Sequence, residues 1–220
     1  MGEVGLVFKQ PFAEQVAFFR GKLADLVPTA HWDDLQGAAH DHSFMVAGAA
    51  KADLLTDLAA AVDRSLSEGQ SLEAFRKDFL KTINQRGWSG FTGDDSPARR
   101  AWRTRIIYTT NASTSYHAGR FAQLQAGGFA FWVYHHNDSV THPRPLHVSW
   151  NGITLPPGHP FWRTHYTPNG WGCRCFVTGS RQAGTDVPLP EGWDSIDEKD
   201  RGAAGYRQGL GLCPRCQCGG

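Results

Sequence analysis

The sequence predicts an α+β fold, with a helical N-terminal region, a small unit rich in β-hairpins, histidine and cysteine, and an irregular C-terminal tail. Apolar residues recur at helical spacing through the first half, and aromatic and β-branched runs replace them after Gly127. The Gly-rich stretch at residues 87–97 predicts a loop and an internal boundary. We therefore expect a helical region at residues 1–90, a core of one long helix and a β-rich unit at residues 98–180, and an extended, disordered tail at residues 181–220.

The composition limits the classes of function. The chain has 220 residues and is 40% hydrophobic, which is enough to bury a core. Lys and Arg number 22 against 21 Asp and Glu, so the net charge of +1 provides no overall attraction to nucleic acid or to an acidic membrane. No run reaches the roughly 18 apolar residues of a membrane span, and the N-terminus lacks the features of a secretory signal. We expect a protein made in the cytoplasm, with its five cysteines reduced or bound to metal.

Three apolar stripes at helical spacing predict the N-terminal helices. Their members are Phe12, Val16, Phe19 and Leu23, then Leu54, Leu58, Val62 and Leu66, then Leu72, Phe75, Phe79 and Ile83. Ser71 is the expected N-cap of the third helix, and Glu73 is well placed in its first turn.

A long helix is expected to follow, from Ala98 toward Gly127. Its spacing predicts a buried face made of Trp102, Ile106, Thr109, Ser113, Tyr116 and Leu124. This face is unusually polar for a core stripe.

Strands are expected after Gly128. The run "FAFWVYHH" is aromatic and β-branched, and Asn151-Gly152 within "VSWNGITL" predicts a tight hairpin turn between two strands. The resulting β-rich unit, residues 128–178, ends with Cys173 and Cys175. It contains six of the ten histidines, namely His135, His136, His142, His147, His159 and His165.

Cys173 and Cys175 form a Cys-x-Cys pair, which brings two thiols together on one extended segment. Nearby histidines can complete the tetrahedral nitrogen and sulfur shell that zinc prefers. The alternative is that both cysteines are small core residues and that the histidines lie at the surface. The residues alone leave both interpretations open.

A different metal chemistry is the ββα-metal nuclease arrangement, in which a histidine activates water beside a metal that holds the phosphate. Its candidates here are His135, His136, Asn151 and His159. Prolines and glycines in "PPGHPFWRTHYTPNG" argue against the helix that this arrangement requires. The chain also lacks Gly-x-Ser-x-Gly, His-Glu-x-x-His and a phosphate-binding loop, so we predict no enzyme.

Four segments carry a resemblance to a known family: "RTRIIYTTNASTSYHAGR", "NDSVTHPRPLHVSWNG", "HPFW" and "PNGWGCRCFV", in that order. Together with the N-terminal segments "FKQPFAEQVAFFRGKL", "MVAGAAKADLL" and "AFRKDFLKTINQRGW", they resemble the Mu-type F-like minor head protein family of tailed phages. The positions that recur in this family correspond to Arg105, Asn111, Asp138, Arg144, His147, Gly152, Pro160, Trp162, Pro168, Asn169, Gly170, Cys173, Arg174 and Cys175.

The resemblance implies a structural component of a phage head. Proteins of this family associate with the portal and the procapsid interior and are needed for head assembly. We accordingly expect portal, capsid and scaffold proteins as partners, contact with packaged DNA and no membrane. The expected location is the interior of the virion head, and the host cytoplasm during assembly.

Within the β-rich unit we predict His147, Cys173 and Cys175 as ligands of a zinc ion, with Asp138 or His159 as the fourth. His147 lies at the mouth of the predicted hairpin, and a metal there would fasten a loop-rich unit that has little core.

Four further residues are predicted to bind partners. Arg144 and Arg174 can contact the portal or DNA phosphates, although arginines are more often solvated or paired with acids. Arg105 and Asn111 are the corresponding candidates on the long helix.

The tail "CPRCQCGG" looks like a metal motif, but we predict that it arises from a shifted reading frame. The chain resembles its relatives up to Lys199 and not beyond. Codons for the following residues, read from their second nucleotide, can encode a segment that contains Ile-Asp-Lys-Gly-Trp-Ala-Tyr-Ala-Pro-Gly, which resembles the tail of the family. Sequencing the gene tests this prediction, since a shifted frame that does not encode Ile-Asp-Lys-Gly-Trp would contradict it.

Overall fold

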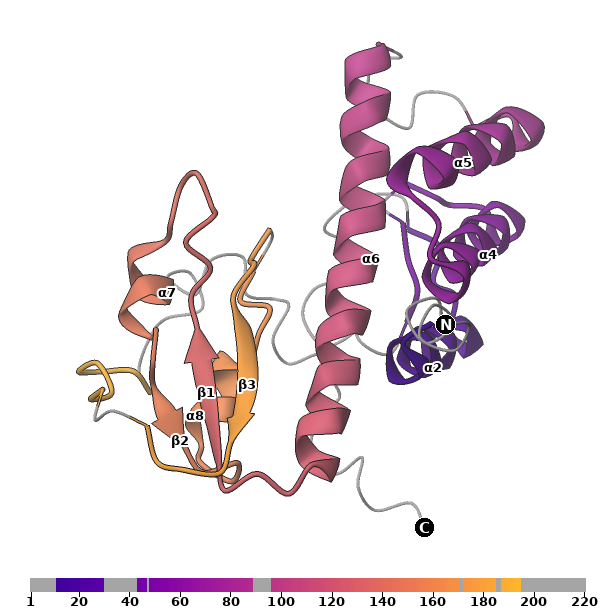
Figure 1. The fold of residues 1–220 in the computed structure, drawn as a ribbon. Coiled ribbons are helices and arrows are strands. Elements are labelled where there is room, and N and C mark those ends of the chain that lie inside the picture. The colour runs from indigo at the N-terminus through magenta and orange to yellow at the C-terminus, as the bar shows by residue number, and fades with distance from the viewer. Residues whose placement is uncertain are drawn as a thin grey trace, which may run out of the picture. The chain divides into compact units, whose positions relative to one another are not determined.

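The computed structural model describes residues 11–29, 43–46, 48–88, 96–170, 172–184 and 187–194. The chain divides into two compact units, Met1–Gly119 and Arg120–Gly220 (Figure 1). The boundary lies inside the long helix α6, Pro97–Ala126, and does not coincide with the loop predicted at residues 87–97. The tail after Lys199 and its cysteines lie outside the described residues.

The first unit is helical, as the sequence predicts. It contains α2 (Ala13–Gly21), the 3-10 turn η1 (Lys22–Ala24), α4 (Ala52–Glu68), α5 (Leu72–Arg86) and most of α6. The three predicted stripes supply much of its core, with Phe19, Leu54, Leu58, Val62, Phe75, Phe79 and Ile83 buried together.

The ends of α4 and α5 follow from their sequence. Ser71 caps α5 through its side chain, which accepts a hydrogen bond from the backbone of Ala74 at 3.2 Å. Gly69 and Gly87 follow the last residues of the two helices in the left-handed conformation that favours glycine. The two helices are therefore fixed in length by local signals that the sequence already carries.

The helix α6 forms where predicted, but its predicted buried face is wrong. Trp102 is 53% exposed and Tyr116 is 44% exposed. Of the predicted residues Leu124 alone is buried, and the other buried residues of α6 include Thr104, Ile107, Thr114, Ser115, His117 and Ala118. Hydroxyl groups on this face bond to the carbonyl groups of the preceding turn, as Ser115 does with Asn111 at 2.5 Å.

The polar face of α6 is buried because it allows close packing. A Cβ atom on Gly119 would lie 2.8 Å from the backbone nitrogen of Gln15 and 2.8 Å from the ring of Phe12. The Gln15 side chain donates hydrogen bonds to the carbonyl of Ala112 and to the hydroxyl of Ser115. Small and hydroxyl-bearing residues thus admit α2, which a stripe of large apolar residues would keep away.

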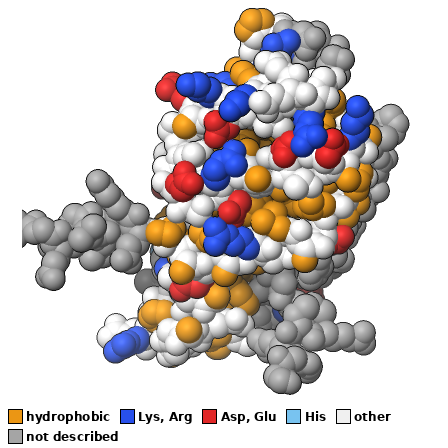
Figure 2. All heavy atoms as spheres, turned by 90° about the vertical axis from the view of Figure 1, so that its right-hand side faces the viewer, with side chains coloured by type: hydrophobic (Ala, Val, Ile, Leu, Met, Phe, Trp, Pro, Cys, Tyr) orange, Lys and Arg blue, Asp and Glu red, His pale blue; other side chains and the backbone are white. Residues whose placement is uncertain are grey.

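The surface of the first unit carries charges of both signs. Figure 2 shows basic and acidic side chains interspersed over the face that it draws. Arg20 contacts Asp63, and Arg86 contacts both Asp53 and Asp57. Mixed charges of this kind create no strong field of one sign on that face. Among the described helices, none has the length and apolar character needed to cross a membrane.

The second unit contains a three-stranded antiparallel sheet in the order β2-β1-β3 (Figure 1). Its elements are β1 (Phe131–His135), α7 (Pro145–Ser149), β2 (Thr154–Leu155), α8 (Phe161–His165) and β3 (Phe176–Ser180). Its core is aromatic, with Trp132, Tyr134, Trp150, Phe161 and Trp162 buried. The α+β class is confirmed.

The hairpin predicted across Asn151-Gly152 is wrong in this unit. Pro145 starts the short helix α7, because its fixed φ suits the first turn of a helix, so the residues before the turn do not form a strand. Gly152 does adopt a positive φ of 85°, in a turn that joins α7 to β2. The helix α8 also forms, within the stretch whose prolines and glycines argued against one, and Pro160 precedes its first residue.

Candidate metal centre

The pairing of β1 with β3 brings a histidine next to a cysteine. His135 of β1 pairs with Phe176 of β3 in antiparallel register. The next step of this register places His136 opposite Cys175, just beyond the ends of both strands. Side chains alternate between the two faces of a strand, so His136 lies on the face of the buried Trp132 and Tyr134.

The same alternation organises the segment before β3. Cys173, Cys175 and Val177 are buried, whereas Arg174 and Phe176 between them are exposed. An extended Cys-x-Cys pair therefore turns both sulfur atoms to one side.

The turn after α7 places the second histidine. Its residues are held against the end of β1, since Asn151 accepts a hydrogen bond from the backbone of His136 at 2.9 Å and Gly152 donates one to the carbonyl of Tyr134 at 2.8 Å. His147 belongs to α7, is buried and stacks on Trp150 with ring centroids 5.2 Å apart.

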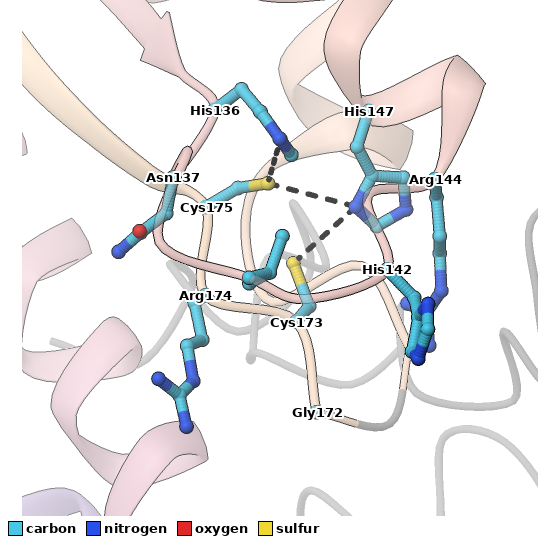
Figure 3. Close-up of a pocket in the computed structure, with 10 residues that line it drawn as sticks. His136, Asn137, His142, Arg144, His147, Gly172, Cys173, Arg174 and Cys175 are labelled. Carbon is cyan, nitrogen blue, oxygen red and sulfur yellow. Dashed lines mark hydrogen bonds between the residues drawn. The ribbon is translucent and has the colours of Figure 1, made fainter.

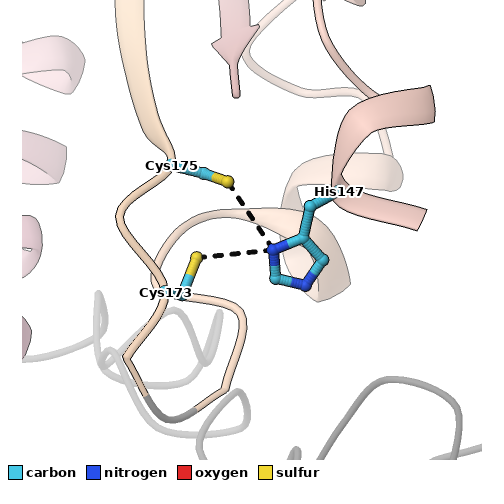
Figure 4. A group of neighbouring side chains, drawn as sticks. All are labelled: His147, Cys173 and Cys175. Carbon is cyan, nitrogen blue, oxygen red and sulfur yellow. Dashed lines mark hydrogen bonds between the residues drawn. The ribbon is translucent and has the colours of Figure 1, made fainter. Parts of the chain in front are cut away.

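Three side chains from these segments form a group among the described residues: His147, Cys173 and Cys175 (Figure 4). Their ligand atoms all lie within 4.8 Å of one another. The Nδ1 atom of His147 lies 3.6 Å from each of the two sulfur atoms. This group contains the three residues that the sequence predicts as zinc ligands.

The two cysteines of the group differ in pKa. A hydrogen bond from the Cys175 thiol lowers the pKa of Cys173 to about 6, and the guanidinium of Arg144 acts in the same direction. The shared hydrogen bond raises the pKa of Cys175 to about 11. At neutral pH the pair therefore carries one thiolate and one thiol. Burial raises the pKa of Tyr134 well above its usual value, and its neutral hydroxyl hydrogen-bonds the Cys175 sulfur.

Such a donor set suits a soft or borderline metal ion. Thiolate and imidazole are the ligands that zinc prefers in structural sites, and a thiolate is already present at neutral pH. Oxygen-seeking ions such as magnesium and calcium do not favour sulfur donors. The three residues can therefore hold a zinc ion.

The structure places the two candidates for a fourth ligand elsewhere. The Asp138 side chain is 94% exposed, and its carboxylate lies 3.9 Å from Nε2 of His136. The Nδ1 atom of His159 accepts a hydrogen bond from the backbone of Phe161 at 3.1 Å, and its ring packs against Trp193. Neither residue belongs to the group of three.

The predicted binding residues divide into two kinds. Arg144 donates a hydrogen bond to the carbonyl of Asn169 at 3.0 Å, and Asn111 donates one to the carbonyl of Ile107 at 2.9 Å. Arg105 and Arg174 have exposed side chains. Figure 3 shows the guanidinium of Arg174 directed away from the two sulfur atoms.

The four nuclease candidates do not converge. His135 turns to the opposite face of β1 from His136, where it contacts the Thr178 hydroxyl at 2.7 Å and stacks on Phe176. Asn151 binds the backbone of His136, and His159 binds the start of α8. Of the four, only His136 lies beside a cysteine sulfur, that of Cys175.

His136 also lies next to this group, although the sequence did not predict it as a zinc ligand. Its Nδ1 atom lies 3.6 Å from the Cys175 sulfur, and its side chain is 5% exposed (Figure 3). Strand alternation from Trp132 and Tyr134 was the signal in the sequence that pointed inward at this position.

Comparison with known proteins adds a family. Residues 56–178 match the model of the family described as "Phage Mu protein F like protein". This range contains His136 and the group of His147, Cys173 and Cys175. No solved structure matches the chain significantly.

Two curated relatives are similar over most of the chain. The "Putative capsid assembly protein F" of Escherichia phage Mu is 34% identical over 178 residues, which cover 76% of this chain and 40% of that protein. The "Mu-like prophage FluMu F protein" of Haemophilus influenzae is 33% identical over 156 residues, which cover 68% of this chain and 37% of that protein. The chain thus spans about two fifths of the length of these relatives.

Proposed function

The chain belongs to the phage Mu protein F-like family, and on that premise we propose that it takes part in the assembly of a phage head. The observation that carries the proposal is the match over residues 56–178, which includes the helices α5 and α6 and the whole cysteine and histidine cluster. The printed name of the relative from phage Mu, a capsid assembly protein, supports the same function.

The finer proposal is a non-catalytic minor head protein. Its partners are the portal protein and the capsid or scaffold proteins, its location is the interior of the head, and packaged DNA is a further contact. The mixed charges on the helical unit favour a protein partner there, because DNA binding needs a concentrated basic surface.

Arg105 and Arg174 are the residues that we propose for partner contact. Both side chains are exposed, whereas Arg144 and Asn111 are engaged in hydrogen bonds within the chain. Trp102, which is exposed, lies three residues before Arg105 and therefore on the same side of α6. An exposed tryptophan beside an arginine is typical of the anchor residues of protein interfaces.

The functional test removes the gene from its phage and counts filled heads by electron microscopy, with the intact gene supplied in trans as the control. We expect head production to fall sharply without the gene and to recover with it. A normal yield of filled heads in its absence would overturn the proposal.

A second test addresses the partner. The full chain is co-expressed with the portal protein of the same phage, and their association is measured after Arg105→Glu or Arg174→Glu. Lys77→Glu and Arg163→Glu are matched controls, since both side chains are exposed on helices of the same two units. We expect the first pair of substitutions to weaken association and the second pair to leave it unchanged. Equal effects from all four would contradict this assignment.

We also propose that His147, Cys173 and Cys175 hold a zinc ion. Support comes from the mutual distances of their ligand atoms and from the low pKa of Cys173. A bound zinc would fasten α7 to the segment before β3. Elemental analysis of the purified chain, with Cys173→Ser as the comparison, measures whether zinc is present and whether it depends on this cysteine.

A further inference from the structure

We propose that His136 is the fourth ligand of this metal centre and that Asp138 orients its ring, so that the site is a closed structural centre with two thiolates and two imidazoles. The inference rests on the zinc site proposed above and assigns what that proposal leaves open. It decides between two kinds of zinc centre, because a site with three protein ligands keeps a position for water and catalysis, and a site with four does not.

The distances among the donor atoms carry the argument. Zinc binds sulfur at about 2.3 Å and nitrogen at about 2.0–2.1 Å, so a tetrahedral angle between them separates the sulfur and nitrogen atoms by about 3.6 Å. Three of the four sulfur-to-nitrogen pairs of such a site measure 3.6 Å: Cys173 to His147, Cys175 to His147 and Cys175 to His136. His136 is not in the group whose ligand atoms all lie within 4.8 Å of one another, so its ring has to move toward Cys173 and His147 to complete the site.

Hydrogen bonding alone does not account for this pattern. A ring nitrogen offers one hydrogen or one lone pair in the plane of the ring. The Nδ1 atom of His147 nevertheless faces two sulfur atoms at equal distance, and the Cys175 sulfur faces two Nδ1 atoms at equal distance. A metal ion at the centre of these atoms would draw each of them toward one point, whereas hydrogen bonds would join them in separate pairs.

The burial and the source of His136 fit a ligand. Its side chain is 5% exposed, although it lies beyond the end of β1, where strand residues commonly meet solvent. The backbone of His136 is held by Asn151 at 2.9 Å, and the register with β3 sets its ring opposite Cys175. Figure 3 shows the ring directed toward the Cys175 sulfur and away from Asn137.

The Asp138 carboxylate lies near the second ring nitrogen of His136, beyond hydrogen-bond distance, and its exposed side chain can turn to make the hydrogen bond that ligating histidines commonly have there. With Nδ1 toward the metal, Nε2 of His136 carries the hydrogen, and the Asp138 carboxylate lies 3.9 Å from it. Such carboxylates fix the orientation of the ring and raise its basicity. Asp138 is therefore a positioning residue, two residues beyond the ligand it serves.

The test uses the full chain with cobalt(II) in place of zinc, because tetrahedral cobalt absorbs in the visible range and each thiolate adds sulfur-to-cobalt charge transfer in the near ultraviolet. We expect the spectrum of two thiolates and two nitrogens, unchanged by added azide. His136→Ala is expected to admit azide and to lower metal affinity by more than the roughly 10- to 100-fold that loss of an outer-shell partner costs, and free imidazole is expected to restore the original spectrum.

A variant that gains a charge-transfer band provides a result that loss of folding cannot explain. His136→Cys is expected to add a third thiolate to the charge-transfer band. His142→Cys is expected to add none, although His142 is exposed and lines the same pocket as His136 (Figure 3). Asp138→Asn is expected to lower metal affinity by up to about tenfold while the cobalt spectrum keeps its shape.

The outcomes separate the two proposals. A wild-type protein that binds cobalt but accepts azide, or a His136→Cys variant without the extra band, would overturn the fourth ligand and leave the zinc site standing. A wild-type protein that binds neither cobalt nor zinc would overturn the zinc site itself. An Asp138→Asn variant with wild-type affinity would remove Asp138 from the assignment.

Discussion

The two units of this protein are stabilised in different ways. The helical unit buries Leu58, Phe75, Phe79 and their neighbours in one continuous hydrophobic core. The described part of the second unit after α6 has three short strands and two helices of five residues each around a smaller aromatic core, with the group of His147, Cys173 and Cys175 and the neighbouring His136 beside it. In the proposal above, a zinc ion would add a few strong contacts to this aromatic core, whereas the helical unit relies on packing alone.

Removing the metal tests this contrast most strongly. Structural zinc contributes about 10–16 kcal/mol of apparent binding free energy in small zinc domains. We expect a strong chelator to abolish the protection of backbone amides around β1, α7 and β3 and to leave α4 and α5 protected. Hydrogen exchange of the full chain, followed by mass spectrometry, measures both units at once. Equal loss of amide protection in the two units would contradict the prediction that metal stabilises the second unit alone.

The reverse experiment weakens the helical unit. Phe79→Ala removes a fully buried ring, and such changes cost about 3–5 kcal/mol. We expect unfolding of the helices at lower denaturant concentration with the metal content unchanged. Phe176→Ala is the matched control, because this ring is 40% exposed. A loss of metal in the Phe79→Ala protein would show that the units are not independent.

A smaller effect is expected at the contact between α2 and α6. Gly119→Ala places a methyl group 2.8 Å from the Gln15 nitrogen and from the Phe12 ring, and overpacking of this kind costs about 1–3 kcal/mol. Gly21→Ala is the control, since nothing lies within 4 Å of the methyl group it would add. We expect thermal unfolding at lower temperature for the first variant and not for the second.

The smallest expected effect is the release of a single proton when the metal binds. Cys173, with its pKa lowered to about 6, is already a thiolate at pH 7, and Cys175, with its pKa raised to about 11, is not. Binding of one metal ion at pH 7 should therefore release about one proton, which titration calorimetry in buffers of different ionisation enthalpy measures. Release of two protons would contradict the low pKa of Cys173.

The same values set the pH dependence of the metal-free protein. The folded pKa of Cys173 lies below its ordinary value of 9.0, so its stabilisation is complete above pH 9 and is lost as the pH falls toward 6. The folded pKa of Cys175 lies above 9.0, so its stabilisation is complete below pH 9 and is lost as the pH rises toward 11. We expect the stability of the second unit to be greatest near pH 9 in denaturation experiments without metal.

The helices could be predicted from the sequence because apolar spacing and caps are local. The stripes through Phe19, Leu58 and Phe79 and the cap at Ser71 are confirmed. The buried face of α6 around Ser115 and Gly119 could not be predicted in this way, because the close approach of α2 selects glycine and hydroxyl residues over large apolar side chains.

The sequence indicated His147, Cys173 and Cys175 because their chemistry is explicit, and the structure brings the three together. The position of His136 depends on two facts that composition does not contain. One is the register that pairs His135 with Phe176, and the other is the helix α7 in place of a hairpin strand. Both arise from contacts between distant segments, which a local pattern does not specify.

The spacing of the ligands has a consequence for synthesis on the ribosome. His136 and Cys175 are 39 residues apart, and the helices α2, α4 and α5 all precede them. At about 5–20 residues per second, the chain spends about 2–8 seconds between producing the first of these ligands and the last. During that interval the helical unit can fold while the second unit still lacks its thiols, so zinc binding at the proposed site would come late and act on one unit alone.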